Sequence, residues 1–306
     1  MKKTDLEQII DNCVPYIENG KLADYIPELA KAEKKDFGIS IIEGEQMKSF
    51  AGDYNKKFTI QSIVKPILLL MALMDNGIDC VRKQIGVEAT GKPFDAFNYS
   101  DQALVSDNIN PMINAGAIVL CTLIKGKNYE ERFERLLQLT RKLANNPNIE
   151  VDEAVYRSER DNGNKNRALA YMLKAYGMIS DDVESVVGCY FRACSIKVSC
   201  EDLAQIGFVL ANHGKSIITG EQIFPEEYAR YVNAILMTCG MYDGSGEFAI
   251  DVGVPAKSGV GGGIMAVIPG RMGIGIYSPA LDKKGNSIAG IKALEIISRE
   301  NNLSIF

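Results

Sequence analysis

Short strand-like segments lie near both ends of this 306-residue chain, and the long stretch between them is mainly helical. Residues 37–42 and 46–51 read as two strands joined by a turn, and residues 252–258, 264–268 and 272–277 read as three more, separated by glycine and proline. This order differs from strand–helix–strand repetition. It predicts an α+β fold with one antiparallel sheet built from both chain termini, flanking helices and an inserted, mainly helical lobe.

Helical periodicity or length marks most of the middle of the chain. The expected helices cover residues 110–124, 129–143, 167–176 and 199–211, with a closing helix at 290–300 and helical character in the first 35 residues, interrupted near Tyr25. No linker or repeat divides the chain. We therefore expect a single catalytic domain over residues 1–306, with a sheet lobe at about 1–57 and 245–306 and a helical lobe at about 58–244.

Histidine is nearly absent, which limits the available chemistry. With His213 alone, the chain offers little for a multi-histidine metal site, and a Ser-His-Asp triad or a Cys-His pair has a single candidate base. We therefore expect no metal, and we expect acid–base chemistry to use Lys, Tyr, Asp or Glu.

Charge and hydropathy limit the classes of partner. The net charge is −5, from 34 basic and 39 acidic residues without a basic stripe, which argues against a nucleic-acid partner. The longest apolar run, residues 67–74, is much shorter than the roughly 20 residues of a membrane span, and the N-terminus lacks the apolar core of a signal peptide. The seven cysteines contain no C-x-x-C pattern or zinc-site spacing, so we interpret them as reduced thiols of a cytoplasmic protein.

Ser62-Ile63-Val64-Lys65 is an S-x-x-K pattern at the start of an apolar helix. Pro66 is tolerated only in a first helical turn, and residues i and i+3 share a helix face, so the Lys65 amine is expected near the Ser62 hydroxyl. Burial of Lys65 would disfavour its charged form, and lowering its pKa from about 10.4 to about 7 corresponds to roughly 5 kcal/mol. The alternative from these residues alone is a capping serine followed by a lysine that extends to solvent.

Two further patterns accompany S-x-x-K. Lys257-Ser258-Gly259 begins a glycine-rich segment to Gly263 and is similar to the K-[ST]-G strand of S-x-x-K acyl transferases, although it has Ser where Thr is common. Its backbone could supply an oxyanion-hole N–H, or the segment could simply be a tight turn. Ser106-Asp107-Asn108 matches S-D-N. The three patterns together suggest a serine β-lactamase-like architecture with an acyl-serine intermediate.

Longer segments resemble the serine-dependent glutaminases in their minimal bacterial-type form. These segments are residues 24–29, 58–65, 110–118, 156–167, 239–246 and 257–263, in family order. The resemblance implies a serine β-lactamase-like fold, hydrolysis of L-glutamine to L-glutamate and ammonia without a cofactor, and assembly as a homodimer or homotetramer. It makes Ser106-Asp107-Asn108 a coincidental match, because Asn114 takes the pocket role nearby.

The resemblance also implies roles for individual residues. Ser62 would be the nucleophile, Lys65 its general base and Tyr242 a second proton-transfer group, and the backbone N–H groups of Ser62 and Val260 would form the oxyanion hole. The expected substrate-binding residues are Tyr25, Gln61, Ser62, Asn114, Glu159, Asn166, Tyr190, Tyr242 and Val260. Glutamine is a zwitterion, so Glu159 suits its ammonium group, while Tyr25 and Asn114 suit its carboxylate. Residues 161–164 read as a loop between Glu159 and Asn166.

Two other functions remain open from the residues themselves. One is a β-lactamase or penicillin-binding enzyme of the same architecture, which the missing export signal disfavours. The other is a non-catalytic ligand-binding module on the same fold.

Overall fold

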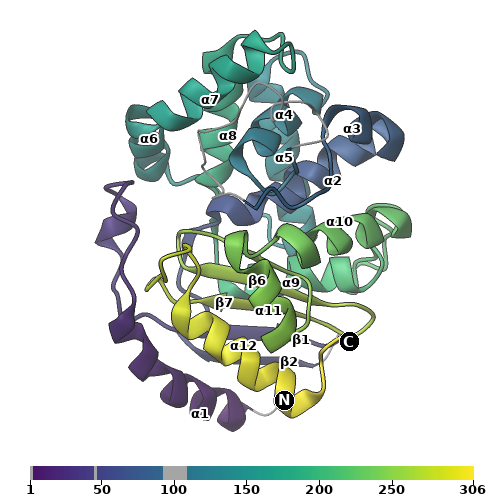
Figure 1. The fold of residues 1–306 in the computed structure, drawn as a ribbon. Helices are drawn as coiled ribbons and strands as arrows, with labels where there is room; N and C mark the ends of the chain where they lie inside the picture. The colour runs from purple at the N-terminus through teal and green to yellow at the C-terminus, as the bar shows by residue number, and fades with distance from the viewer. Residues whose placement is uncertain (1–2, 45–46, 92–108) are drawn as a thin grey trace.

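The computed structural model describes residues 3–44, 47–91 and 109–306, and an antiparallel sheet forms its lower half in the view of Figure 1. Its strands are β1 (Gly38–Ile42), β2 (Lys48–Gly52), β5 (Ala256–Ser258), β6 (Gly263–Ile268) and β7 (Met272–Tyr277), in the spatial order β2-β1-β7-β6-β5. The antiparallel pairing of β1 with β7 joins the two ends of the chain. The predicted α+β class, with one sheet built from both termini, is confirmed.

The two faces of the sheet are covered by helices from different parts of the chain (Figure 1). On one face, isoleucines of β1, β6 and β7 pack in one hydrophobic cluster with residues of α1 (Lys3–Cys13) and α12 (Ile288–Asn301). The opposite face packs against α9 (Cys200–Ala211), which contacts β7, β6 and β1. Every residue of β1, β6 and β7 is buried, because both faces are covered.

The helices of the middle segment build a second hydrophobic cluster, which extends to Met265, Val267 and Tyr277 of the sheet. The helices are α2 (Lys65–Asn76), α3 (Ile78–Gln84), α4 (Asn114–Leu123), α5 (Tyr129–Ala144), α6 (Glu153–Asn162), α7 (Asn164–Ala175), α8 (Val183–Cys194) and α10 (Glu226–Cys239), and a short ribbon of β3 (Phe58–Thr59) with β4 (Lys197–Val198) lies beside them. In the described part of the chain, no helix combines the length and the apolar composition needed to cross a bilayer.

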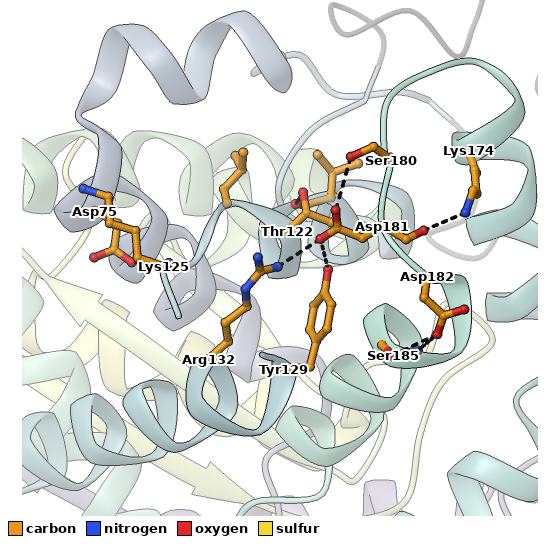
Figure 2. A network of polar contacts seen from close by, with 12 residues as sticks. Asp75, Thr122, Lys125, Tyr129, Arg132, Lys174, Ser180, Asp181, Asp182 and Ser185 are labelled. Carbon is orange, nitrogen blue, oxygen red and sulfur yellow. Dashed lines mark hydrogen bonds and ion pairs between the residues drawn. The ribbon is translucent and has the colours of Figure 1, made fainter. Parts of the chain in front are cut away.

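Polar contacts hold the segment that precedes α8 (Figure 2). The Tyr129 hydroxyl and the Arg132 guanidinium both donate to the Asp181 carboxylate, and these donors lower the pKa of Asp181. Lys174 donates to the backbone carbonyl of Asp181, and Asp182 accepts from the Ser185 N–H as the N-cap of α8. These contacts fix where α8 begins, and α8 carries pocket residues farther along.

Four expectations for local structure were wrong in detail. The expected helix at 110–124 begins only at Asn114, where α4 starts. The expected strand at 252–258 is reduced to Ala256–Ser258, because residues 252–255 form the turn that follows α11 (Ser245–Asp251), with Gly253 in a left-handed conformation. The expected loop at 161–164 is reduced to Gly163, since α6 ends at Asn162 and α7 begins at Asn164. Helical character in the first 35 residues is limited to α1 and short 3-10 turns at Val14–Asn19 and Leu29–Lys31. Ser106-Asp107-Asn108 lies outside the described residues.

Candidate active site

Ser62 lies in a tight turn at the start of α2. After β3, the 3-10 turn Gln61–Val64 continues directly into α2, and Pro66 occupies its first turn, where a missing N–H costs little. Gln61 has a φ of +48°, a left-handed conformation that residues other than glycine seldom adopt. Residues 65–73 of α2 are buried, which explains the apolar run that follows Lys65. The predicted helix start beside Ser62 is confirmed.

A cavity of about 340 Å³ opens at Ser62. Its lining residues are Tyr25, Ile26, Gln61, Ser62, Asn114, Glu159, Asn162, Gly163, Asn164, Lys165, Asn166, Tyr190, Cys194 and Val260. All the expected substrate-binding residues except Tyr242 are in this set. They come from segments that span most of the sequence, so only the folded chain brings them together.

Asn114 connects the interior to the cavity. Lys65 is fully buried, and its Nζ donates to Asn114 Oδ1 at 2.7 Å and to the Met112 carbonyl at 3.0 Å. The Tyr190 hydroxyl also donates to Asn114 Oδ1, at 3.1 Å, while Asn114 Nδ2 donates to Asn166 Oδ1 at 2.9 Å. The Asn114 side chain therefore holds Lys65 and two pocket residues in one network.

Tyr242 is buried and contacts the Ser62 side chain. It occupies a 3-10 turn, Tyr242–Gly244, with a φ of +53°, so a second residue beside Ser62 has a left-handed backbone. Burial raises the pKa of Tyr242 far above its ordinary value, while contacts with the Ser62 side chain and the Val260 backbone act in the opposite direction. The phenol is therefore neutral in the resting site and within hydrogen-bonding reach of Ser62.

Glu159 supplies a carboxyl group to the wall of the cavity. It is 6% exposed, and burial raises its pKa to about 7, although a hydrogen bond with the Gln61 side chain partly offsets this. A carboxyl with this pKa changes charge near neutrality. A bound cation would favour its ionised form.

The glycine-rich segment forms the connection between β5 and β6. The Gly259 N–H donates to the Gly263 carbonyl, and the Gly262 N–H donates to the Gly259 carbonyl, so the segment is a tight turn. The same turn brings Val260 to the cavity wall. Turn geometry and a place at the site, considered above as alternatives, therefore occur together.

The cavity residues that were not expected from sequence are Ile26, Asn162, Gly163, Asn164, Lys165 and Cys194, and Lys257 was expected only as part of the K-[ST]-G pattern. Cys194 lines the cavity four residues after Tyr190 on α8, and this i, i+4 spacing was a usable signal. Lys257 is buried against the Tyr242 ring, with its Nζ 4.3 Å from the ring centroid. That contact joins residues far enough apart that no local pattern could indicate it.

Comparisons with known proteins agree with this geometry. The family model described as Glutaminase matches residues 20–306. A glutaminase of Clostridium tetani is 52% identical over 306 residues, covering all of both chains, and one of Clostridioides difficile is 52% identical, covering all of this chain and 99% of the other. The covalent complex of a Bacillus subtilis glutaminase with 5-oxo-L-norleucine, formed by reaction with 6-diazo-5-oxo-L-norleucine, has a TM-score of 0.91 at 38% identity and 99% coverage of both chains.

Proposed function

The chain belongs to the glutaminase family and is a glutaminase, an amidohydrolase acting on L-glutamine, and we propose that it forms an acyl-enzyme intermediate on Ser62. Its fold is the serine β-lactamase-like fold of the bacterial glutaminases. The products are L-glutamate and ammonia. The residue roles below are supported by the geometry of the cavity.

The cavity suits a zwitterionic amino acid with a neutral side-chain amide. We assign the substrate ammonium to Glu159, whose buried carboxylate gains an opposite charge on binding. We assign the substrate carboxylate to neutral donors, Tyr25 and the Asn114–Asn166 amides, with Tyr190 and Gln61 completing the wall. Holding both charged groups directs the side-chain amide towards Ser62, and such orientation increases the rate.

Acylation begins when the Ser62 hydroxyl proton passes to Lys65 Nζ and Ser62 Oγ attacks the amide carbon. The backbone N–H groups of Ser62 and Val260 stabilise the negative oxygen that develops. The C–N bond then breaks as the leaving nitrogen gains a proton, either directly from Lys65 or from Tyr242, whose phenolate then takes the proton held by Lys65, and ammonia leaves. In deacylation, water attacks the acyl carbon and its proton passes to Lys65. The ester bond to Ser62 then breaks as Ser62 Oγ takes that proton from Lys65, which releases glutamate and restores the resting enzyme.

The environment of Lys65 suits a base that must begin neutral. Complete burial disfavours the ammonium form. A neutral amine has two N–H groups, which match the Met112 carbonyl and Asn114 Oδ1 as acceptors. Its remaining lone pair is the site that takes the Ser62 proton.

The convergence of the expected residues on one cavity at Ser62 is the observation that carries this mechanism. We expect Ser62→Ala and Lys65→Ala to lower glutamate release at least 1,000-fold with an unchanged circular dichroism spectrum. Ser298→Ala is the matched control: this serine is buried in α12 and donates to the Val252 carbonyl, and its loss should leave kcat unchanged.

A second readout identifies the nucleophile directly. Treatment with 6-diazo-5-oxo-L-norleucine should add one 5-oxo-norleucine group on Ser62, detected by peptide mass spectrometry, and none in Ser62→Ala. Near-normal glutamate release by Ser62→Ala would refute the mechanism. Turnover of asparagine or of a chromogenic β-lactam would indicate a different acyl-serine reaction. Binding of glutamine without release of ammonia would indicate a non-catalytic ligand-binding module.

We also propose that the protein is cytoplasmic and forms a homodimer or homotetramer. The cysteines are free thiols, which supports a reducing compartment. The oligomer rests on the family resemblance alone. Light scattering coupled to size-exclusion chromatography tests it: a mass of one chain, about 33.5 kDa, would contradict the assembly.

A further inference from the structure

Lys257 is a second fully buried lysine, beside the proposed machinery but without a role in the steps above. It lies on β5 with no exposed surface. Its Nζ donates to the Ser258 carbonyl at 2.7 Å and to the Gly240 carbonyl at 2.9 Å, and it lies over the Tyr242 ring. Burying an amine costs several kcal/mol, so a side chain needed only to fill this space would be better apolar.

The contacts of Lys257 join β5 to the segment that carries Tyr242. The Gly240 carbonyl accepts from both Lys257 Nζ and the Ser258 N–H. A Cβ on Gly240 would lie 1.7 Å from the Ala256 carbonyl oxygen, so this segment packs directly on β5. Lys257 therefore contacts one face of the Tyr242 ring and also hydrogen-bonds the backbone two residues before Tyr242, at Gly240.

The opposite side of the same turn is also held by polar groups. Ser245 Oγ donates to the Tyr242 carbonyl at 2.9 Å and accepts from the Met241 N–H, while Asn286 Nδ2 donates to the Met241 carbonyl. Tyr242 needs such support, since its positive φ costs of order 1–3 kcal/mol and persists only when neighbouring contacts enforce it. Lys257 is the contact in this set that touches the aromatic ring.

We propose that Lys257 is a positioning residue of the glutaminase reaction, which holds the Tyr242 phenol against Ser62 by supporting its ring and its strained turn. The inference rests on the proposed role of Tyr242 in proton transfer. Lys257 itself touches no substrate, because it is enclosed behind Tyr242 and does not line the cavity at Ser62. Burial lowers the pKa of Lys257, and a neutral amine still has two N–H groups, which match the Gly240 and Ser258 carbonyls.

The test is a double-mutant cycle between Lys257→Met and Tyr242→Phe. Methionine keeps the length of the side chain and loses the amine. We expect Lys257→Met to lower kcat at least tenfold with less than a twofold change in KM, because the groups that bind glutamine are unaffected. In the Tyr242→Phe background the same change should lower kcat less than twofold, since the phenol it positions is already absent.

Each kcat is divided by the fraction of chains labelled at completion by 6-diazo-5-oxo-L-norleucine. A merely structural role would lower that fraction or the melting temperature and leave kcat per labelled chain unchanged. Lys292→Met is the matched control. Lys292 lies in α12 and also contacts the face of a tyrosine ring, but that ring belongs to Tyr16, which has no role in the proposed reaction. It should leave kcat unchanged.

Equal losses from Lys257→Met in both backgrounds would overturn the inference. If the methionine variant does not fold, Lys257→Gln, which keeps an N–H donor, takes its place in the cycle. Failure of both variants to fold would assign Lys257 to the fold alone and also overturn the inference. Activity in Ser62→Ala would instead refute the proposed mechanism, so the two failures are distinguishable.

Discussion

At the scale of single residues, the site combines strained backbone with buried ionisable groups. Gln61, which precedes Ser62, and Tyr242, which contacts its side chain, both adopt positive φ, and Glu159 is enclosed in the cavity wall. Such features lower stability and persist where the surrounding structure enforces them. They concentrate here around one hydroxyl group.

Glu159 gives a pH-dependent prediction for stability. Its folded pKa of about 7 lies above the ordinary 4.5, so the native state holds the proton more tightly than the unfolded chain. Stability from this group is complete below pH 4.5 and is lost as the pH rises through 7. At pH 8 the shift corresponds to about 3 kcal/mol, so Glu159→Gln should be more stable than the parent by up to that amount.

Urea denaturation of both proteins at pH 8 and pH 5 measures this difference. The advantage of Glu159→Gln should shrink at pH 5, where the parent carboxyl is also protonated in the native state. The variant should at the same time lose glutamine binding, seen as a KM raised at least tenfold, because the substrate ammonium loses its counter-charge. A variant less stable than the parent at both pH values would contradict the electrostatic argument.

At the scale of elements, α9 approaches β7 more closely than side chains normally permit. Gly273 and Gly275 face the helix, and a Cβ on them would lie 2.1 Å from the Ala204 carbonyl oxygen and 2.0 Å from that of Cys200. The alternation Met-Gly-Ile-Gly-Ile in β7 therefore places isoleucines towards α1 and α12 and glycines towards α9. The alternation in β7 therefore follows from packing: α9 lies close enough to the sheet to require glycine, whereas α1 and α12 leave room for isoleucine side chains.

Alanine substitutions test this packing, because they should change the free energy of unfolding in opposite directions at two kinds of glycine. Gly273→Ala and Gly275→Ala should lower the free energy of unfolding by about 1–3 kcal/mol, since backbone must move to admit the methyl group. Gly188→Ala in α8 is the control, because a Cβ there meets nothing within 4 Å. It should raise stability by roughly 0.5–1 kcal/mol through helix propensity. Urea denaturation measures all three, and a neutral Gly273→Ala would refute the close approach.

At the scale of the whole molecule, α9 makes the helical and sheet regions dependent on each other. It packs on β7, β6 and β1 and also contacts α5, although its residues fall within the expected helical lobe. The larger hydrophobic cluster likewise extends from the helices onto one face of the sheet. We therefore propose that residues 1–306 form one cooperative catalytic domain, with the two lobes as regions of it.

Leu294→Ala tests that cooperativity. Leu294 is buried in α12, in the cluster on the opposite face of the sheet from α9, and its truncation should cost about 2–5 kcal/mol. Circular dichroism at 222 nm, which reports chiefly the helices, should show one transition displaced as a whole. A second transition at the parent temperature would indicate independent lobes.

Local interactions made part of the fold and site predictable from sequence. The S-x-x-K spacing fixes Ser62 and Lys65 through one helical turn, and the apolar run after Pro66 predicts a buried helix, which the structure has. Strand-like alternation likewise indicated β1, β6 and β7 to within a residue or two. Local composition misled at residues 161–164, where asparagine and glycine suggested a loop but tertiary packing, with Gly163 against the Phe191 ring, continues the helices.

By itself, then, the sequence determined the class of fold and, through its resemblance, the family, and it predicted Ser62 as the nucleophile with Lys65 beside it. Only the tertiary structure decided which groups contact the residues around Ser62: Asn114 contacts Lys65, and Lys257 contacts Tyr242. The physical reason is the separation in sequence between the residues that interact. Hydrogen bonds between residues a turn apart follow from the local backbone, whereas Lys65 and Asn114, 49 positions apart, meet only after the core has closed around them.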